Sequence, residues 1–270
     1  MRIKKLILLV LTVILAVLAI HLIENRQSTP DLPEEPVPGE QSEPGESRDD
    51  AVQPVVSRYT ASRGVVTALE AGGVTFTFAD GRESVTFADV SADDWYLDAL
   101  NFVASNGLMS GISEEDGTVE FRADYGITRA QFAVLLLHFS AAEVPASAAE
   151  LPDVEAGSWY HDGAVWAVEN DLLTAQEDGS FQPEGFVSCE EVIAALFRLA
   201  GEPQVEGPLP EEYPYGAKVS DSALPAVVWA WSVGLIAEDS CVWYPTQAAS
   251  RGQLALILMR YDALVGITAE

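Results

Sequence analysis

Basic residues are scarce in this sequence, and their scarcity excludes several classes of partner. The 270 residues contain 14 lysines and arginines against 42 aspartates and glutamates, which gives a formal net charge of -28 at pH 7. A chain this acidic repels nucleic-acid phosphates and anionic lipid headgroups. We therefore expect no nucleic-acid partner, and a ligand that is either neutral or meets a local cationic side chain such as Arg129.

Cysteine and histidine are also rare, which argues against a disulfide scaffold, a metal centre and an enzyme. Two cysteines, Cys189 and Cys241, are too few for a disulfide framework or a zinc module, and the sequence does not show whether they approach closely enough to pair. The three histidines have no ligand-type neighbour at metal-binding spacing. No nucleophile elbow, phosphate loop or Cys/His pair is present. We expect no catalytic residue, no metal and no cofactor.

Residues 1–24 show the pattern of an export signal or a membrane anchor. Three basic residues precede an uncharged segment from Leu6 to Ile23. As a helix this segment spans about 27 Å, close to the thickness of the hydrocarbon core of a bilayer. A cleaved signal peptide and an uncleaved anchor both fit, and we favour the anchor. In either case the positive-inside tendency places the rest of the chain outside the cytoplasm.

Two segments of different composition follow. Residues 25–56 are rich in proline and acidic residues and hold almost nothing apolar, so they are predicted to form a disordered linker. Residues 57–86 alternate in polarity around Gly72-Gly73 and Asp80-Gly81, which predicts a small β-hairpin or meander. So few strands need a surface to pack against, and we expect the following domain to supply it.

An internal repeat of about 60 residues dominates the remaining sequence. Thr128-Arg129-Ala130-Gln131 opens an apolar helical pattern, and Ser188 and Ser250 open related patterns 60 and then 62 residues further along. Residues 87–111 also match residues 151–175 at eight of 25 positions, including Trp95/Trp159 and Tyr96/Tyr160. Each unit is predicted to hold a helix, a loop and a second helix capped by Thr or Ser. The predicted units are residues 87–142, 143–203 and 204–270.

The first unit resembles an S-layer homology domain. The resemblance is carried by Phe87-Xaa-Asp89-Val90, Trp95-Tyr96, Asn106–Gly111 and Ile127–Gln131; it is fair in the second unit and partial in the third, whose start is degenerate. It implies a mainly α fold, with three helix-loop-helix repeats in a pseudo-threefold bundle of first helices and grooves between the units. In that family the grooves bind pyruvylated secondary cell wall polymers, and the arginine of a Thr-Arg-Ala-Glu motif engages the acidic group.

The resemblance and the chemistry of a helix start together predict the ligand-binding residues. Unpaired N–H groups and the helix dipole favour an anion there, and a guanidinium can grip a carboxylate bidentately. Because Cys189 replaces the arginine in the second unit, we rank the groove of Arg129 first, that of Arg251 second and that of Cys189 last. The predicted glycan-binding residues are Thr128, Arg129, Gln131, Ser250, Arg251, Gln253, Trp95 and Trp159.

Each of these residues also has a structural alternative. The two arginines can cap helices and pair with nearby carboxylates. The tryptophans can stack on sugar rings, but we favour packing in the core for both Trp95 and Trp159.

These features predict an exported, non-catalytic protein of the cell surface or wall, held in the cytoplasmic membrane by its N-terminal helix. Its expected partner is a secondary cell wall polymer. The alternative is a scaffold whose grooves have lost glycan binding and contact another envelope protein. Cys189, the glutamines in place of the family's glutamate, and the eroded third unit favour that alternative.

Overall fold

A computed structural model describes residues 59, 64–70, 72–143, 150–205, 207–211, 213, 215–237 and 243–268. The predicted anchor at residues 1–24 and the predicted linker at residues 25–56 lie outside this part of the chain, so both stay predictions. Within the described ranges, no helix has both the length and the apolar character that a bilayer span requires.

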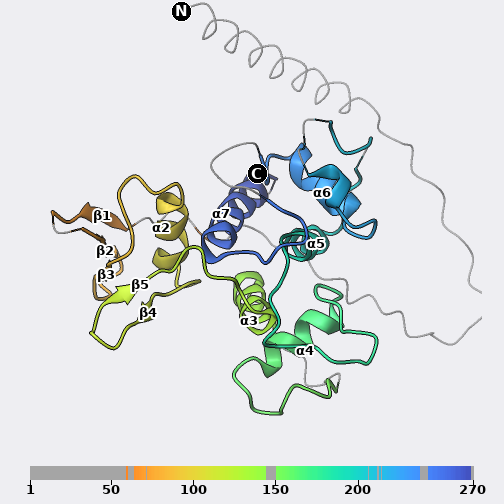
Figure 1. Cartoon of the computed structure of the whole chain (residues 1–270), viewed down its shortest axis with the longest axis horizontal. Helices are drawn as coiled ribbons and strands as arrows, with labels where there is room; N and C mark the ends of the chain where they lie inside the picture. The colour runs from red at the N-terminus through yellow and green to blue at the C-terminus, as the bar shows by residue number, and fades with distance from the viewer. Residues whose placement is uncertain are drawn as a thin grey trace, which may run out of the picture. The chain divides into compact units, whose positions relative to one another are not determined.

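The described residues form six α-helices and a five-stranded sheet (Figure 1). The strands are β1 (Val65–Ala68), β2 (Val74–Thr77), β3 (Val85–Phe87), β4 (Ile112–Ser113) and β5 (Val119–Glu120). The helices are α2 (Leu97–Ser105), α3 (Arg129–Ser140), α4 (His161–Glu169), α5 (Cys189–Leu199), α6 (Leu224–Ser232) and α7 (Arg251–Thr268), with a 3-10 turn at Gly216–Lys218. The mainly α class predicted from the sequence is therefore wrong, because a mixed sheet accompanies the helices.

This sheet is larger than the hairpin or meander expected at residues 57–86. Its strand order is β1-β2-β3-β5-β4, and all neighbours are antiparallel except β3 and β5, which pair in parallel at Phe87 and Val119. In β2 the alternating pattern buries Val74 and Phe76. The sheet grows beyond the meander because the loop after α2 contributes β4 and β5, which are two residues each and too short to show a pattern in the sequence.

Polar contacts attach the sheet to α2. The side chain of Asn101, buried in α2, accepts a hydrogen bond from the Gly64 amide at 2.8 Å and donates one to the Gly64 carbonyl at 3.0 Å. The Arg82 guanidinium donates to the carbonyl oxygens of Ala104 and Ser105, at 3.4 and 2.5 Å, where α2 ends. The last carbonyl groups of a helix lack donors from the helix itself, and Arg82 supplies one here, in addition to the Gly107 amide that donates to the Ala104 carbonyl. Helix α2 is thus part of the surface that the strands require.

The helices pair between the predicted units rather than within them. Helix α4 packs against α3, α6 against α5, and α2 against α7, so the third predicted unit closes onto the first. Gly163 shows how closely α4 approaches α3, since a methyl group on it would lie 2.8 Å from the amide nitrogen of Val134. A helix-loop-helix unit therefore does not form a packed pair of helices by itself.

A closed ring of backbone hydrogen bonds joins the segments that precede α3, α5 and α7. Ile127 N–H donates to the Ala249 carbonyl at 2.9 Å, Ala249 N–H to Val187 at 2.9 Å, and Val187 N–H to Ile127 at 3.0 Å. Helices α3, α5 and α7 consequently begin around this ring, with α2, α4 and α6 outside them (Figure 1). The expected central bundle of first helices is wrong, because it is the second helices that begin at the centre.

Two aspartates shared by the predicted units fix the loops that lead to the ring. Asp89 accepts hydrogen bonds from the amides of Phe121 and Arg122, each at 2.7 Å, and Asp153 makes the equivalent pair in the second unit at the same distance. Arg122 and its counterpart Gln182 have left-handed φ angles of 55° and 56°. The carboxylates hold this uncommon conformation in place. They thereby position the Phe carbonyls that the arginines use.

Candidate ligand-binding grooves

Each of the helices α3, α5 and α7 begins with a reciprocal side-chain cap. In α3 the Thr128 hydroxyl accepts from the Gln131 amide at 3.2 Å, while the Gln131 side-chain oxygen accepts from the Thr128 amide at 3.1 Å. Such capping boxes satisfy two backbone donors at once. The equivalent pairs are Ser188 with Glu191 and Ser250 with Gln253. The predicted capping roles of Thr128 and Ser250 are confirmed.

The next backbone N–H groups at these helix starts already have partners. Arg129 N–H donates to the Gly185 carbonyl at 2.7 Å, and Ala130 N–H donates to the Pro183 carbonyl at 3.0 Å. The starts of α5 and α7 make matching pairs of bonds with neighbouring loops. The prediction that unpaired N–H groups receive an anion here is therefore wrong. An anionic ligand has to be held by side chains.

Arg129 lies buried, and all three nitrogens of its guanidinium are bonded. Only 3% of the residue is exposed. Nε donates to the Phe181 carbonyl at 2.8 Å, Nη2 to the Thr174 carbonyl at 2.7 Å, and Nη1 to Glu191 Oε1 at 2.7 Å. The guanidinium also lies 4.9 Å from the centre of the Phe181 ring. These contacts correspond to the structural alternative: Arg129 ties α3 to the loops of the second unit and to α5.

Arg251 makes the corresponding carbonyl contacts without a carboxylate. Nε donates to the Phe121 carbonyl at 2.7 Å and Nη2 to the Ser110 carbonyl at 2.6 Å, and the guanidinium lies 4.8 Å from the centre of the Phe121 ring. Within the described part of the chain, Nη1 has no hydrogen-bond partner. Burial lowers the pKa of Arg251 and the nearby Asp89 opposes this, but an arginine remains cationic at physiological pH.

A cavity of about 310 Å³, here named the Arg251 groove, gives access to this side chain. Trp159 projects beside it, 65% exposed and edge-on to Tyr160 with ring centres 5.3 Å apart. The core packing favoured for Trp159 is therefore wrong, whereas Trp95 is half-buried and packs against the core. The groove combines a cation, an aromatic face and a neutral amide. Its polar and aromatic lining residues are Ser110, Gln131, His138, Trp159 and Arg251.

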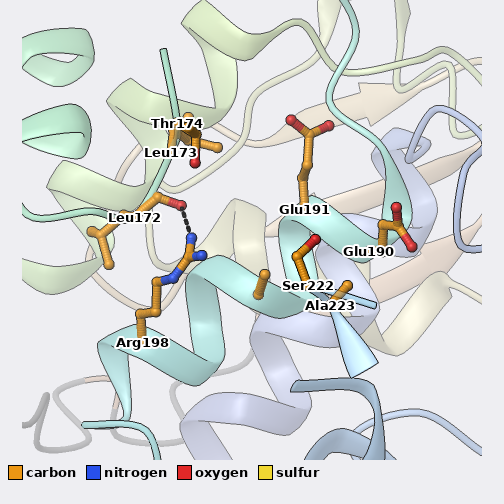
Figure 2. A pocket seen from close by; sticks show the side chains of 9 residues that line it. Leu172, Leu173, Thr174, Glu190, Glu191, Arg198, Ser222 and Ala223 are labelled. Carbon is orange, nitrogen blue, oxygen red and sulfur yellow. Dashed lines mark hydrogen bonds between the residues drawn. The ribbon is translucent and has the colours of Figure 1, made fainter. Parts of the chain in front are cut away.

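A second cavity of about 100 Å³, here named the Glu191 groove, is lined by two carboxylates as well as by a cation (Figure 2). Glu190 and Glu191 project from the start of α5, and Arg198 lies further along the same helix and donates to the Leu172 carbonyl at 3.5 Å. Glu190 is hydrogen-bonded to the amide and hydroxyl of Ser220. Ser222 stands two residues before α6, as Trp159 stands two residues before α4. The Glu191 groove therefore has carboxylates in its lining, and Ser222 occupies the position that Trp159 occupies in the Arg251 groove.

At the start of α5, where Cys189 replaces the arginine, Tyr213 makes one of the contacts that Arg129 and Arg251 make at the starts of α3 and α7. Cys189, at the position of Arg129 and Arg251, is buried, and its sulfur lies 3.8 Å from Gln253 Oε1. The Tyr213 hydroxyl donates to the Trp243 carbonyl at 3.2 Å, as the arginine Nε does in the other junctions. A tyrosine supplies no positive charge, so this junction is unsuited to an anion. Cys241, whose pairing with Cys189 the sequence leaves open, lies outside the described residues.

Tyr213 provides a pH-dependent test of this substitution. Burial raises the pKa of Tyr213 to about 12, from 10.0. The folded state thus favours the neutral phenol, and the resulting stability is fully present below pH 10 and is lost as the pH rises toward 12. We expect Tyr213→Phe to cost about 1 kcal/mol at pH 7 and to flatten the alkaline loss of stability, measured by urea denaturation from pH 7 to 11. An unchanged alkaline slope would exclude Tyr213 as a contributor.

Several contacts at these grooves are not evident from the sequence. The carbonyl oxygens of Ser110 and Thr174 receive the arginines, yet a backbone acceptor leaves no signature in residue type. Tyr213 lies in the degenerate start of the third unit, where no counterpart reveals its role. The sequence shows that position 131 carries glutamine where the family has glutamate. It does not show that Gln131 lines a groove together with Arg251, because this arginine belongs to a different unit.

Comparison with known proteins identifies the first of the predicted units. Residues 86–133 match the S-layer homology domain family; the second and third units rest on the internal repeat alone. "Cell surface glycoprotein 1" of Acetivibrio thermocellus is 27% identical over 161 residues, which are 53% of this chain and 7% of that protein. "Exoglucanase XynX" of the same organism is 25% identical over 182 residues, which are 66% of this chain and 16% of that protein.

A third relative is "Surface layer protein" of Brevibacillus choshinensis, 31% identical over 109 residues, or 38% of this chain and 9% of that protein. The chain thus matches only a small part of each of these much longer relatives. By name, two are surface proteins and one is a glycan-degrading enzyme.

Proposed function

Since the chain carries an S-layer homology domain at residues 86–133, we propose that it is an exported surface protein that binds a pyruvylated cell wall polymer without catalysis. Relatives with different names match this chain over 7%, 16% and 9% of their own length, as expected for a common attachment module. The excess of acidic residues suits a ligand recognised locally rather than by the net charge of the chain.

The observation that carries this proposal is the composition of the Arg251 groove. A pyruvyl group presents one carboxylate, for which a guanidinium with an open Nη1 edge is a suitable partner. The exposed indole of Trp159 offers a flat apolar face for a sugar ring. We therefore place the Arg251 groove first, ahead of the groove of Arg129, because the Arg129 guanidinium is already occupied.

We further propose that residues 1–24 remain attached and hold the chain in the cytoplasmic membrane, so that it links membrane and wall. The positive charges before the apolar run and its length support this placement. The mass of the N-terminal peptide from isolated envelopes distinguishes a retained anchor from a cleaved signal.

Co-sedimentation of the full chain with purified wall polymer tests the proposed function. We expect the chain to sediment with pyruvylated polymer and to remain in solution with the same polymer after its pyruvyl groups are removed by mild acid. Equal binding to both preparations would show that the pyruvyl carboxylate is not recognised. No binding to either, together with stoichiometric recovery of one envelope protein in a pull-down, would instead select the scaffold alternative.

A further inference from the structure

The Arg251 groove continues along α3 to the last turn of this helix. Gln131, Val134 and His138 line it, and their spacing of three and then four residues places them on one face of α3. Arg251 stands near the start of α3, where its backbone amide donates to the Tyr125 carbonyl at 2.9 Å. From Gln131 to His138 the helix rises by about 10 Å. The groove therefore has an arginine near one end and a histidine near the other.

The imidazole of His138 is available to a ligand. The side chain is exposed, and it has no hydrogen-bond or ion-pair partner among the residues that the structure describes; the Tyr59 hydroxyl donates to the backbone carbonyl of His138 instead. At the equivalent positions of the other units, Arg198 and Arg260 each donate to a leucine carbonyl, at 3.5 and 3.2 Å. The chain thus holds the two arginines itself but leaves the histidine side chain without such a contact.

No carboxylate in the groove competes with a ligand for His138. Arg251 and His138 are the charged or titratable side chains among the described residues that line it. Helix α4, which packs against α3, carries His161, Asp162 and Glu169, and none of these three lines the groove. His161 is bonded to Asp162 at 2.9 Å. Protonation of His138 therefore gives the groove a second positive charge that no acidic residue of its lining neutralises.

We propose that His138 is a second ligand contact of the Arg251 groove, and that its protonated imidazole binds another carboxylate of the polymer that Arg251 holds. This inference rests on the proposed function and adds to it a ligand with at least two acidic groups. Histidine side chains gain a proton as the pH falls from about 8 to about 5.5, whereas carboxylates stay ionised over most of this range. Affinity for the polymer is therefore expected to rise as the pH falls.

Calorimetric titration with soluble fragments of pyruvylated wall polymer, at about pH 8 and about pH 5.5, tests the proposal. We expect the affinity of the wild-type chain to be about twofold to fivefold higher at the lower pH, the effect of one solvent-exposed ion pair. His138→Gln should lose this increase. His138→Arg should bind tightly at both pH values, because arginine stays cationic, and Arg198 shows that the position accepts it.

His161→Gln is the matched control, since it removes a histidine that lies outside the groove, and it should keep the pH response of the wild type. A response that persists in His138→Gln, or that disappears in His161→Gln, would overturn the proposal. An equal response with a singly pyruvylated monosaccharide, which offers only one carboxylate, would also overturn it. A wild-type chain that binds no fragment at either pH would refute the proposed function, whereas binding independent of pH would refute the role of His138 alone.

Discussion

Arg129→Met is expected to lower the free energy of unfolding by about 3 to 5 kcal/mol and to leave the polymer affinity of the folded chain unchanged. The substitution removes three charge-assisted hydrogen bonds and leaves the carbonyl of the buried Phe181 without the Arg129 donor. For a domain of this size such a loss lowers the melting temperature by about 10 °C. Thermal and urea denaturation followed by circular dichroism measure both quantities.

Arg122→Met is the matched control for this prediction. Arg122 also pairs with carboxylates, those of Glu114 and Glu120, but its side chain is 24% exposed and theirs are 26% and 34% exposed. Ion pairs that water reaches contribute little to stability, so we expect Arg122→Met to lower the free energy of unfolding much less than Arg129→Met. A loss in Arg129→Met no larger than that in Arg122→Met would show that the buried guanidinium does not hold the units together.

Arg251→Met is expected to reduce affinity for pyruvylated polymer by about tenfold to a hundredfold, the equivalent of one charge-assisted hydrogen bond at roughly 1.5 to 3 kcal/mol. Its two carbonyl contacts are lost as well, so affinity has to be measured below the melting transition of the variant. Arg251→Lys retains the charge but not the planar fork, and we expect an intermediate affinity. Equal affinities in wild type and Arg251→Met would show that Arg251 does not bind the ligand.

Local features of the fold follow from the sequence because they depend on neighbouring residues. Thr128 forms the expected cap, and the turns at Gly72-Gly73 and Asp80-Gly81 separate strands as predicted. The shared Asp89 and Asp153 are identified by the repeat, and their equivalent hydrogen bonds explain why both units retain them. Periodicity and turn chemistry suffice at this level.

Features that depend on contacts between units do not follow from the sequence. The same apolar helix face fits a partner in its own unit or in the next, so the pairing of α3 with α4 is not determined by periodicity. Trp159 and Trp95 occupy equivalent positions, yet one is exposed in a groove and the other packs near Gly252, because their surroundings come from different units. The ranking of Arg129 above Arg251 did not include the ion pair between Arg129 and Glu191, because the two residues belong to different units.

Calorimetric titration of the wild-type chain, Arg251→Met and Arg129→Met with soluble fragments of pyruvylated wall polymer distinguishes the Arg251 groove from the groove of Arg129 as the ligand site. If the Arg251 groove is the ligand site, the wild-type chain binds one equivalent of ligand. Folded Arg129→Met retains this binding, and Arg251→Met loses it or binds much more weakly. Binding that survives in Arg251→Met and disappears in folded Arg129→Met would contradict this placement of the site.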